Sequence, residues 1–218
     1  MTELNRRLID TPHSLIAGTT GSGKSVLLNS VVCDLIEVGA CLALIDLKRV
    51  ELARYKNCST VGAFMTEPEH IPGFLNGMCD IMEERYEEME AKGLLKYDEA
   101  DIFIVIDELA DLMTYPAVLP PLVKLGRLGR AARMHMICAT QDPSRRTLVA
   151  QLMQNFTACA ALRCRSAIES RQIIGVAGAE SLPKYGKCIL WDADGFSRHN
   201  IPMLEDEEIM KICNAHSK

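Results

Sequence analysis

The sequence predicts a single α/β domain in which a mostly parallel central sheet is flanked by helices. Three observations support this prediction. A glycine-rich stretch, Gly18–Ser25, stands between an apolar run and a helical pattern. A second apolar run, Ile102–Ile106, ends in the paired carboxylates Asp107 and Glu108. Apolar runs and helical patterns alternate along the 218 residues, as expected for parallel strands joined by crossover helices.

The stretch Gly18–Ser25 fits the pattern G-x-x-x-x-G-K-[ST] at every fixed position. Residues 14–17 predict a buried strand before it, and residues 26–36 predict a helix after it. Such a loop turns backbone N–H groups inward, and the helix start adds positive charge, so an oligophosphate fits there. Lys24 would neutralise the terminal phosphates, and the Ser25 hydroxyl would join the shell of Mg²⁺. The predicted nucleotide-binding residues are Gly18, Thr19, Thr20, Gly21, Ser22, Gly23, Lys24, Ser25 and Val26.

Composition narrows the class of protein. Hydrophobic residues make up 48% and charged residues 24% of the chain, which suits one globular domain. A net charge of −5 gives no overall basic signal, so contact with nucleic acid would need a local patch or an assembly. The nine cysteines form no C-x-x-C pair, which favours free thiols in a reducing cytoplasm. No apolar run is long enough for a membrane span in this piece, and no Cys/His cluster suggests a metal site beyond nucleotide-bound Mg²⁺.

Residues 1–13 are polar, and we expect an N-terminal approach segment without a core of its own. We assign residues 14–204 to the main domain. Residues 41–46 predict a second buried strand that ends on the carboxylate of Asp46. Residues 47–55 mix apolar and basic residues at helical spacing, and a solvated face and a functional face are equally open for that helix.

A short strand is expected at residues 59–64, followed by a long helix from 68 to 92 whose apolar positions recur at helical spacing. The acidic residues between them favour a face turned to water over a partner-binding surface. These residues are Glu83, Glu84, Glu87, Glu88 and Glu90.

The run Ile102–Ile106 is typical of a buried parallel strand, and its carboxylates would emerge at the carboxyl edge of the sheet. This is the Walker B pattern. Asp107 would hold the Mg²⁺ shell, and Glu108 would act as the base that polarises the water attacking the γ-phosphate.

A helix from 118 to 133 would carry four basic residues at spacings of three along one face: Lys124, Arg127, Arg130 and Arg133. That stripe is either solvated or reaches the γ-phosphate of a neighbouring subunit. The strand at 134–141 ends in Gln141, which is placed to sense the γ-phosphate or to orient water. In the following loop, Arg145 and Arg146 are candidate contacts for DNA phosphates.

The last third predicts a helix at 148–154, a strand at 157–162 and a helix at 167–174. Residues 187–191 and 196–201, separated by a turn sequence, predict a C-terminal β-hairpin. Residues 205–218 predict a short helix and tail.

Several motifs occur in one order: the loop from Ala17 to Ser25, Ile45-Asp46-Leu47-Lys48, the stretch from Ile106 to Met113, Ala139-Thr140-Gln141, and Gly178-Ala179-Glu180-Ser181-Leu182. In these motifs the chain resembles the FtsK/SpoIIIE family of hexameric DNA translocases, over about Pro12 to Ile201. The resemblance implies a RecA-like P-loop NTPase fold with an extra strand between the Walker A and Walker B strands. It also implies an arginine finger at Arg130 that acts in trans, and catalytic residues Lys24, Asp107, Glu108 and Gln141.

Two positions depart from the family pattern. A basic sensor residue of the family falls at Ala167, with Arg165 nearby, and an arginine that often follows Ala-Thr-Gln is Asp142. The membrane spans, linker, preceding motor subdomain and winged-helix module of full-length members have no counterpart in this sequence. We therefore expect either a fragment, tethered to a membrane through other segments, or a minimal member from a conjugative element or phage.

These observations favour an ATP-dependent motor for double-stranded DNA, with ATP and Mg²⁺ bound between the subunits of a homohexameric ring and hydrolysis stimulated by DNA. Two alternatives stay open. One is a secretion-type relative that moves protein. The other is an ATP-binding assembly module with little turnover, which the residue at Ala167 and the acidic balance favour.

Overall fold

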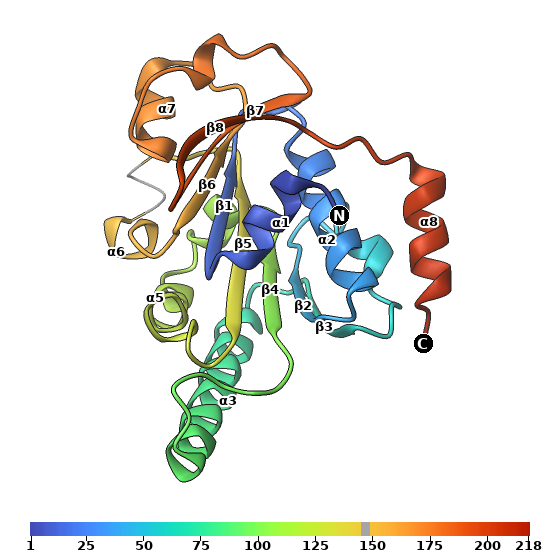
Figure 1. Cartoon of the computed structure of the whole chain (residues 1–218), viewed down its shortest axis with the longest axis vertical. Coiled ribbons are helices and arrows are strands. Elements are labelled where there is room, and N and C mark those ends of the chain that lie inside the picture. The colour runs from blue at the N-terminus through green and yellow to red at the C-terminus, as the bar shows by residue number, and fades with distance from the viewer. Residues whose placement is uncertain (145–148) are drawn as a thin grey trace.

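The computed structural model describes residues 1–144 and 149–218 and places an eight-stranded sheet between two layers of helices (Figure 1). The strand order is β3-β2-β4-β5-β1-β6-β7-β8, with β6–β7 and β7–β8 antiparallel and the other pairs parallel. The predicted α/β class and the C-terminal hairpin are confirmed, and β5 lies between β1 and β4 as the resemblance implies. The strands are β1 His13–Ala17, β2 Cys41–Ile45, β3 Val61–Met65, β4 Ile102–Ile106, β5 Met134–Thr140, β6 Ala158–Ala161, β7 Lys187–Asp192 and β8 Gly195–Asn200.

The central strands are apolar on both sides because both faces of the sheet are covered. In β4, Ile104 and Ile106 point into one core, while Phe103 and Val105 point into the other. This alternation follows from the two-residue period of a strand. Two hydrophobic cores therefore sandwich the sheet, and the carboxyl ends of its parallel strands are held rigidly at one edge.

The helices divide between the two faces. Residues from α1, α2 and α8 pack into one core, and residues from α3, α4, α5, α6 and α7 pack into the other. Within the described ranges, no helix is both long enough and apolar enough to cross a membrane. The helices are α1 Glu3–Asp10, α2 Lys24–Glu37, α3 Ile71–Lys92, α4 Leu109–Leu112, α5 Leu119–Leu128, α6 Ala150–Met153, α7 Ala167–Ile174 and α8 Asp206–Ala215, with 3-10 turns η1 Ala53–Tyr55, η2 Pro116–Val118 and η3 Ala179–Ser181.

Residues 3–10 of the expected N-terminal approach segment form α1, which packs on the main domain. Thr2 caps the start of α1 by accepting the Asn5 N–H at 3.2 Å. Leu4 and Leu8, one helical turn apart, are fully buried against α2 and β1. The short helix therefore belongs to the main domain, because its four-residue apolar spacing lets it cover the sheet beside α2.

At the C-terminus, α8 lies against the outer side of α2 (Figure 1). Its first turn carries a capping box between Glu205 and Glu208, and Ile209 is buried. Arg54 of η1 pairs with Asp206 at 2.8 Å. The predicted short helix thus docks on the domain.

The predicted helix over 118–133 is too long. Helix α5 ends at Leu128, and residues 129–133 form the turn into β5. Arg133 adopts a left-handed φ of 54°, and its guanidinium pairs with Asp101. Lys124 pairs with Glu83 of α3 at 2.9 Å. The four basic residues therefore do not form one stripe, because the tight return to β5 separates the last two from the helix.

The helix expected over 47–55 is also absent, apart from the single turn η1. The Asp46 carboxylate accepts backbone N–H groups from the following residues and so competes with helical hydrogen bonding. The segment instead forms a fixed turn at the carboxyl edge of the sheet.

Candidate nucleotide-binding site

The predicted phosphate loop connects β1 to α2 and requires glycine at specific positions. A Cβ on Gly18 would lie 2.8 Å from Leu162 Cβ and 2.8 Å from Ser22 Oγ, so no larger residue fits. Gly23 has φ 100°, in the left-handed region that side chains disfavour. These two glycines close the loop tightly over the start of α2.

The start of α2 is left open to a ligand. Its N-cap, Gly23, provides no side-chain acceptor, so the N–H groups of the first turn point outward uncapped. Ser22 Oγ is buried and has no hydrogen-bond partner among the described residues. A buried, unpaired hydroxyl beside an uncapped helix start suits an anionic ligand, which would accept from both.

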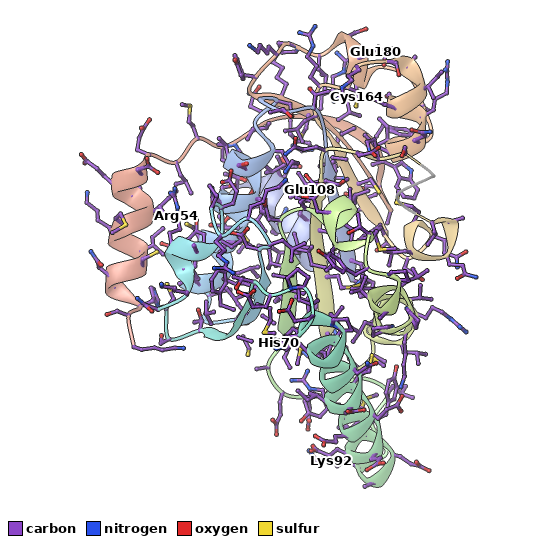
Figure 2. The ribbon with its side chains drawn as sticks, turned by 180° about the vertical axis from the view of Figure 1, so that it is seen from behind. Arg54, His70, Lys92, Glu108, Cys164 and Glu180 are labelled. Carbon is purple, nitrogen blue, oxygen red and sulfur yellow. The ribbon has the colours of Figure 1, made fainter. Side chains whose placement is uncertain are left out.

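Two carboxylates follow β4, where the sheet ends at the loop. Asp107 and Glu108 are 5% and 8% exposed, and Figure 2 shows Glu108 near the middle of the molecule. Lys24 Nζ lies 3.9 Å from Asp107 Oδ1. Burial raises the pKa of Asp107 to about 6; Lys24 opposes this rise, and the nearby carboxylates of Asp46, Glu51 and Glu108 add to it.

These groups fit a divalent cation. Asp107 Oδ1 is buried and has no hydrogen-bond partner within the described parts of the chain. The carboxylates crowded around it leave negative charge that Lys24, whose Nζ lies 3.9 Å from Asp107 Oδ1, offsets in part. An oxygen ligand set that lacks partners is the kind that Mg²⁺ selects. Ser25, the second ligand predicted from the sequence, lies in the first turn of α2.

Glu108 is held by the end of the neighbouring strand. Both of its carboxylate oxygens accept the backbone N–H of Gln141, at 3.0 and 3.1 Å. The side chain of Gln141 in turn accepts from Thr20 Oγ1 at 2.6 Å. The predicted base, the predicted γ-phosphate sensor and the phosphate loop are therefore brought together.

Thr19 has a different environment from the rest of the loop. Its N–H and its hydroxyl both donate to the Arg163 carbonyl, each at 3.0 Å. Thr19 and Thr20 border a cavity of about 410 Å³ whose far wall comes from the segment after β6. Arg163 and Arg165 line that wall. Basic side chains therefore lie beside the loop, although Ala167 stands where the family has a basic residue.

Two contacts of the segment after β2 were not predicted from the sequence. Ser25 Oγ donates to Glu51 Oε1 at 2.8 Å, and Lys48 Nζ lies 2.9 Å from Asp111 Oδ2. The hydrogen bond that Lys48 donates to the Asp111 carboxylate raises the pKa of Lys48. The signal that was available is Asp46, since a segment that follows a strand-ending carboxylate lies at the carboxyl edge of the sheet.

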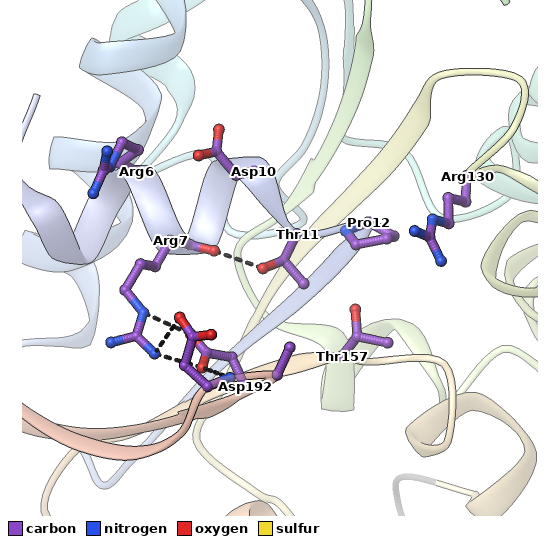
Figure 3. A pocket seen from close by; sticks show the side chains of 10 residues that line it. Arg6, Arg7, Asp10, Thr11, Pro12, Arg130, Thr157 and Asp192 are labelled. Atoms are coloured by element: carbon purple, nitrogen blue, oxygen red, sulfur yellow. Dashed lines mark hydrogen bonds and ion pairs between the residues drawn. The ribbon is translucent and has the colours of Figure 1, made fainter. Parts of the chain in front are cut away.

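Arg130 lies far from this site. It is exposed in the turn before β5, and it lines a cavity of about 470 Å³ at the amino ends of β1 and β5 (Figure 3). Within residues 1–144 and 149–218 its guanidinium forms no ion pair. Across the cavity, Arg7 is bound to Asp192 by hydrogen bonds of 2.7 and 2.5 Å. Because the phosphate loop follows the opposite end of β1, Arg130 cannot reach the site of its own chain.

Two predicted DNA contacts, Arg145 and Arg146, lie outside the described residues. Val26, also predicted to bind the nucleotide, is 38% exposed in the first turn of α2. The described residues of the site thus come from the ends of β1, β2, β4 and β5.

Comparisons with known proteins identify the family of this chain. The sequence profile of the FtsK/SpoIIIE family matches residues 3–101. The DNA translocase FtsK of Helicobacter pylori (strain ATCC 700392 / 26695) is 33% identical over 93% of this chain, which covers 26% of that protein. The DNA translocase FtsK of Chlorobaculum tepidum is 35% identical over 84% of this chain, again 26% of the relative. The chain therefore spans about a quarter of the length of these relatives.

Solved structures share the fold. The pCW3 conjugation coupling protein TcpA, in a monomer form with ATPγS, superposes with a TM-score of 0.86 at 24% identity, covering 95% of this chain and 66% of that one. The cytoplasmic domain of the type VII secretion ATPase EccC of Thermomonospora curvata gives a TM-score of 0.79 at 25% identity, covering 94% of this chain and 28% of that one. By its phosphate loop, its strand order and these sequence matches, the chain belongs to the FtsK/SpoIIIE family.

Proposed function

We propose that this domain is the ATPase motor of a translocase that moves double-stranded DNA. The observation that carries the proposal is the grouping of Lys24, Asp107 and Glu108 beside a phosphate loop in which the buried Ser22 Oγ has no hydrogen-bond partner among the described residues. Relatives that match over most of this chain are named DNA translocases. The proposal extends that activity to this chain.

Hydrolysis would depend on Glu108 as the general base. Its carboxylate is fixed by the Gln141 N–H, so it can accept a proton from water without first reorienting. Lys24 would offset charge on the terminal phosphates. Mg²⁺, held by Ser25 and Asp107 when bound, would neutralise charge on the β- and γ-phosphates.

Arg130 would complete the site of a neighbouring subunit. Its exposed guanidinium is unpaired in the described parts of the chain and stands at the sheet edge opposite its own phosphate loop. A head-to-tail contact that places one subunit's Arg130 at the next subunit's Lys24 repeats around a ring. We propose a homohexamer with ATP bound between subunits.

Contact with DNA would be made through its phosphates, because a moving motor must hold the backbone at every sequence. We propose Arg145 and Arg146, which follow β5 in the sequence, for this contact. Sequence preference would then be weak, and affinity for DNA would fall as salt concentration rises.

A second candidate function is the movement of protein. The likeness to the EccC cytoplasmic domain, described as a type VII secretion ATPase, favours it. The two candidates differ in what stimulates hydrolysis, since a protein-moving relative would not respond to DNA.

The proposal is tested by steady-state ATP hydrolysis with and without long double-stranded DNA, at several protein concentrations. We expect stimulation by DNA that increases as the protein assembles. Glu108→Gln should retain ATP binding and lose turnover by roughly 10²-fold or more, as expected for loss of a general base. An ATPase rate that DNA leaves unchanged, at concentrations where the protein is assembled, would contradict the DNA motor and favour the protein-moving candidate.

A further inference from the structure

The segment after β2, residues 46–52, is held in a fixed conformation at the edge of the proposed site. The Asp46 carboxylate accepts the N–H groups of Lys48, Arg49 and Leu52 at 3.1, 2.8 and 3.0 Å. Arg49 adopts a left-handed φ of 58°, a conformation that non-glycine residues hold only when their surroundings fix it. Residues 46–52 therefore have a fixed backbone conformation, which holds the Glu51 side chain in a defined place.

Residues 46–52 contact both halves of the site. Glu51 Oε1 accepts from Ser25 Oγ at 2.8 Å, which joins it to the first turn of α2. Lys48 pairs with Asp111 at 2.9 Å, which joins it to α4 just after the Walker B carboxylates. The segment thus spans from the residue predicted to bind the metal to the helix that follows Asp107 and Glu108.

The direction of the Ser25 hydroxyl matters for chemistry. A hydroxyl that gives a lone pair to a cation must donate its proton elsewhere. The Walker B carboxylate is a natural acceptor, yet Asp107 Oδ1 has no partner in the described structure. The Ser25 hydroxyl donates its hydrogen bond to Glu51 instead. The lone pairs of Ser25 Oγ are then directed away from Glu51, and Asp107 Oδ1 is left available.

We propose that Glu51 is a positioning residue that orients the Ser25 hydroxyl toward the divalent cation accompanying the nucleotide. The inference rests on the proposed function, because it presupposes nucleotide binding at the phosphate loop. Glu51 is separable from the fold of its segment, since the three hydrogen bonds that anchor residues 46–52 go to Asp46. Removal of the Glu51 carboxylate leaves that anchor in place.

The test measures metal binding directly. Mn²⁺ is titrated into the full chain saturated with ATPγS, and free Mn²⁺ is followed by its electron paramagnetic resonance signal. Binding of a fluorescent ADP analogue in excess chelator reports nucleotide affinity without metal. The variants are Glu51→Ala, Glu51→Gln and, as a matched control, Glu67→Ala, which removes a carboxylate paired with Arg49 of the same segment.

We expect Glu51→Ala to weaken Mn²⁺ binding about 10-fold or more, as loss of a group that orients a metal ligand does. Glu51→Gln should lose less, because its amide oxygen still accepts from Ser25. Nucleotide binding without metal should be unchanged in both, and Glu67→Ala should bind Mn²⁺ as the wild type does.

Two results overturn the inference while the proposed function stands. In one, Glu51→Ala binds Mn²⁺ like the wild type. In the other, Glu51→Ala loses nucleotide affinity equally with and without metal, which means that Glu51 only supports the loop. A wild-type protein that binds neither the Mn²⁺–ATPγS pair nor the metal-free nucleotide contradicts the proposed function itself, and the inference falls with it.

Discussion

Gln141 donates its backbone N–H to both carboxylate oxygens of Glu108, at 3.0 and 3.1 Å. The donor is the main-chain N–H directly after β5, so no substitution at this position except proline removes it. The Gln141 side chain has a separate contact, with Thr20 Oγ1 of the phosphate loop. Orientation of the base and communication with the loop are therefore divided between the backbone and the side chain of one residue.

This division predicts a mild defect for Gln141→Ala. Glu108 stays oriented, and only the link to Thr20 is lost, so we expect the ATPase rate to fall roughly 10-fold, well short of the loss in Glu108→Gln. Thr20→Val removes the same link from the other side. In a double-mutant cycle on kcat, the combined variant should be little worse than either single variant. Fully additive losses would show that the two side chains act independently.

Ser22→Ala should weaken nucleotide binding without lowering the free energy of unfolding. Its buried hydroxyl has no partner in the described chain, so its removal should leave the free energy of unfolding unchanged or raise it by up to about 1 kcal/mol. Loss of a donor to a charged phosphate should weaken ATP binding about 10-fold. Urea unfolding and equilibrium nucleotide titration measure the two effects.

Ser30→Ala is the matched control on the same helix. Ser30 Oγ is buried but donates to the Leu27 carbonyl at 2.9 Å and accepts from Asn5 at 3.1 Å. We expect this variant to lose about 1 kcal/mol of stability and to bind nucleotide normally. If Ser22→Ala behaves like Ser30→Ala, the hydroxyl of Ser22 is a structural group and not a phosphate ligand.

Much of the fold was predictable because strand and helix periods are local. The Ile102–Ile106 strand and the α7 boundaries at Ala167 and Ile174 match the sequence patterns. The end of α5 was not predictable, because Arg130 and Arg133 continue the helical spacing while the chain must turn back into β5. A local sequence pattern does not show where the tertiary structure requires the chain to turn.

The site was predictable where a motif specifies the residue at a fixed position, as it does for Lys24 and Asp107. The role of Glu51 was hidden, because its neighbours have helical spacing and its contact with Ser25 joins residues 26 positions apart. The location of Arg130 at the opposite edge of the sheet also required the strand order, which no local pattern contains.

Acid should destabilise the fold through His13. Burial, together with the nearby His135, lowers the pKa of His13 to about 4. The unfolded chain therefore binds a proton that the folded chain resists, and stability falls as pH decreases from about 6.5 toward 4. This histidine should account for roughly 2 kcal/mol of the stability lost between pH 7 and pH 4.5.

Urea unfolding of His13→Asn at both pH values checks this contribution. The asparagine oxygen can still accept the Met136 N–H that His13 Nδ1 accepts at 3.1 Å. The variant should lose less stability on acidification than the wild type, whereas the exposed control His70→Asn should lose as much. An identical pH dependence in His13→Asn and wild type would show that His13 carries no such penalty.

If Arg130 acts on the site of a neighbouring subunit, mixing two inactive variants should restore activity. Arg130→Ala keeps an intact phosphate site, and Glu108→Gln keeps an intact arginine. In a mixed ring, an Arg130→Ala subunit that receives Arg130 from a Glu108→Gln neighbour has a complete site. We predict that an equimolar mixture regains up to about a quarter of the wild-type ATPase rate. A mixture that forms mixed rings by sedimentation and still hydrolyses no faster than the separate variants would contradict action in trans.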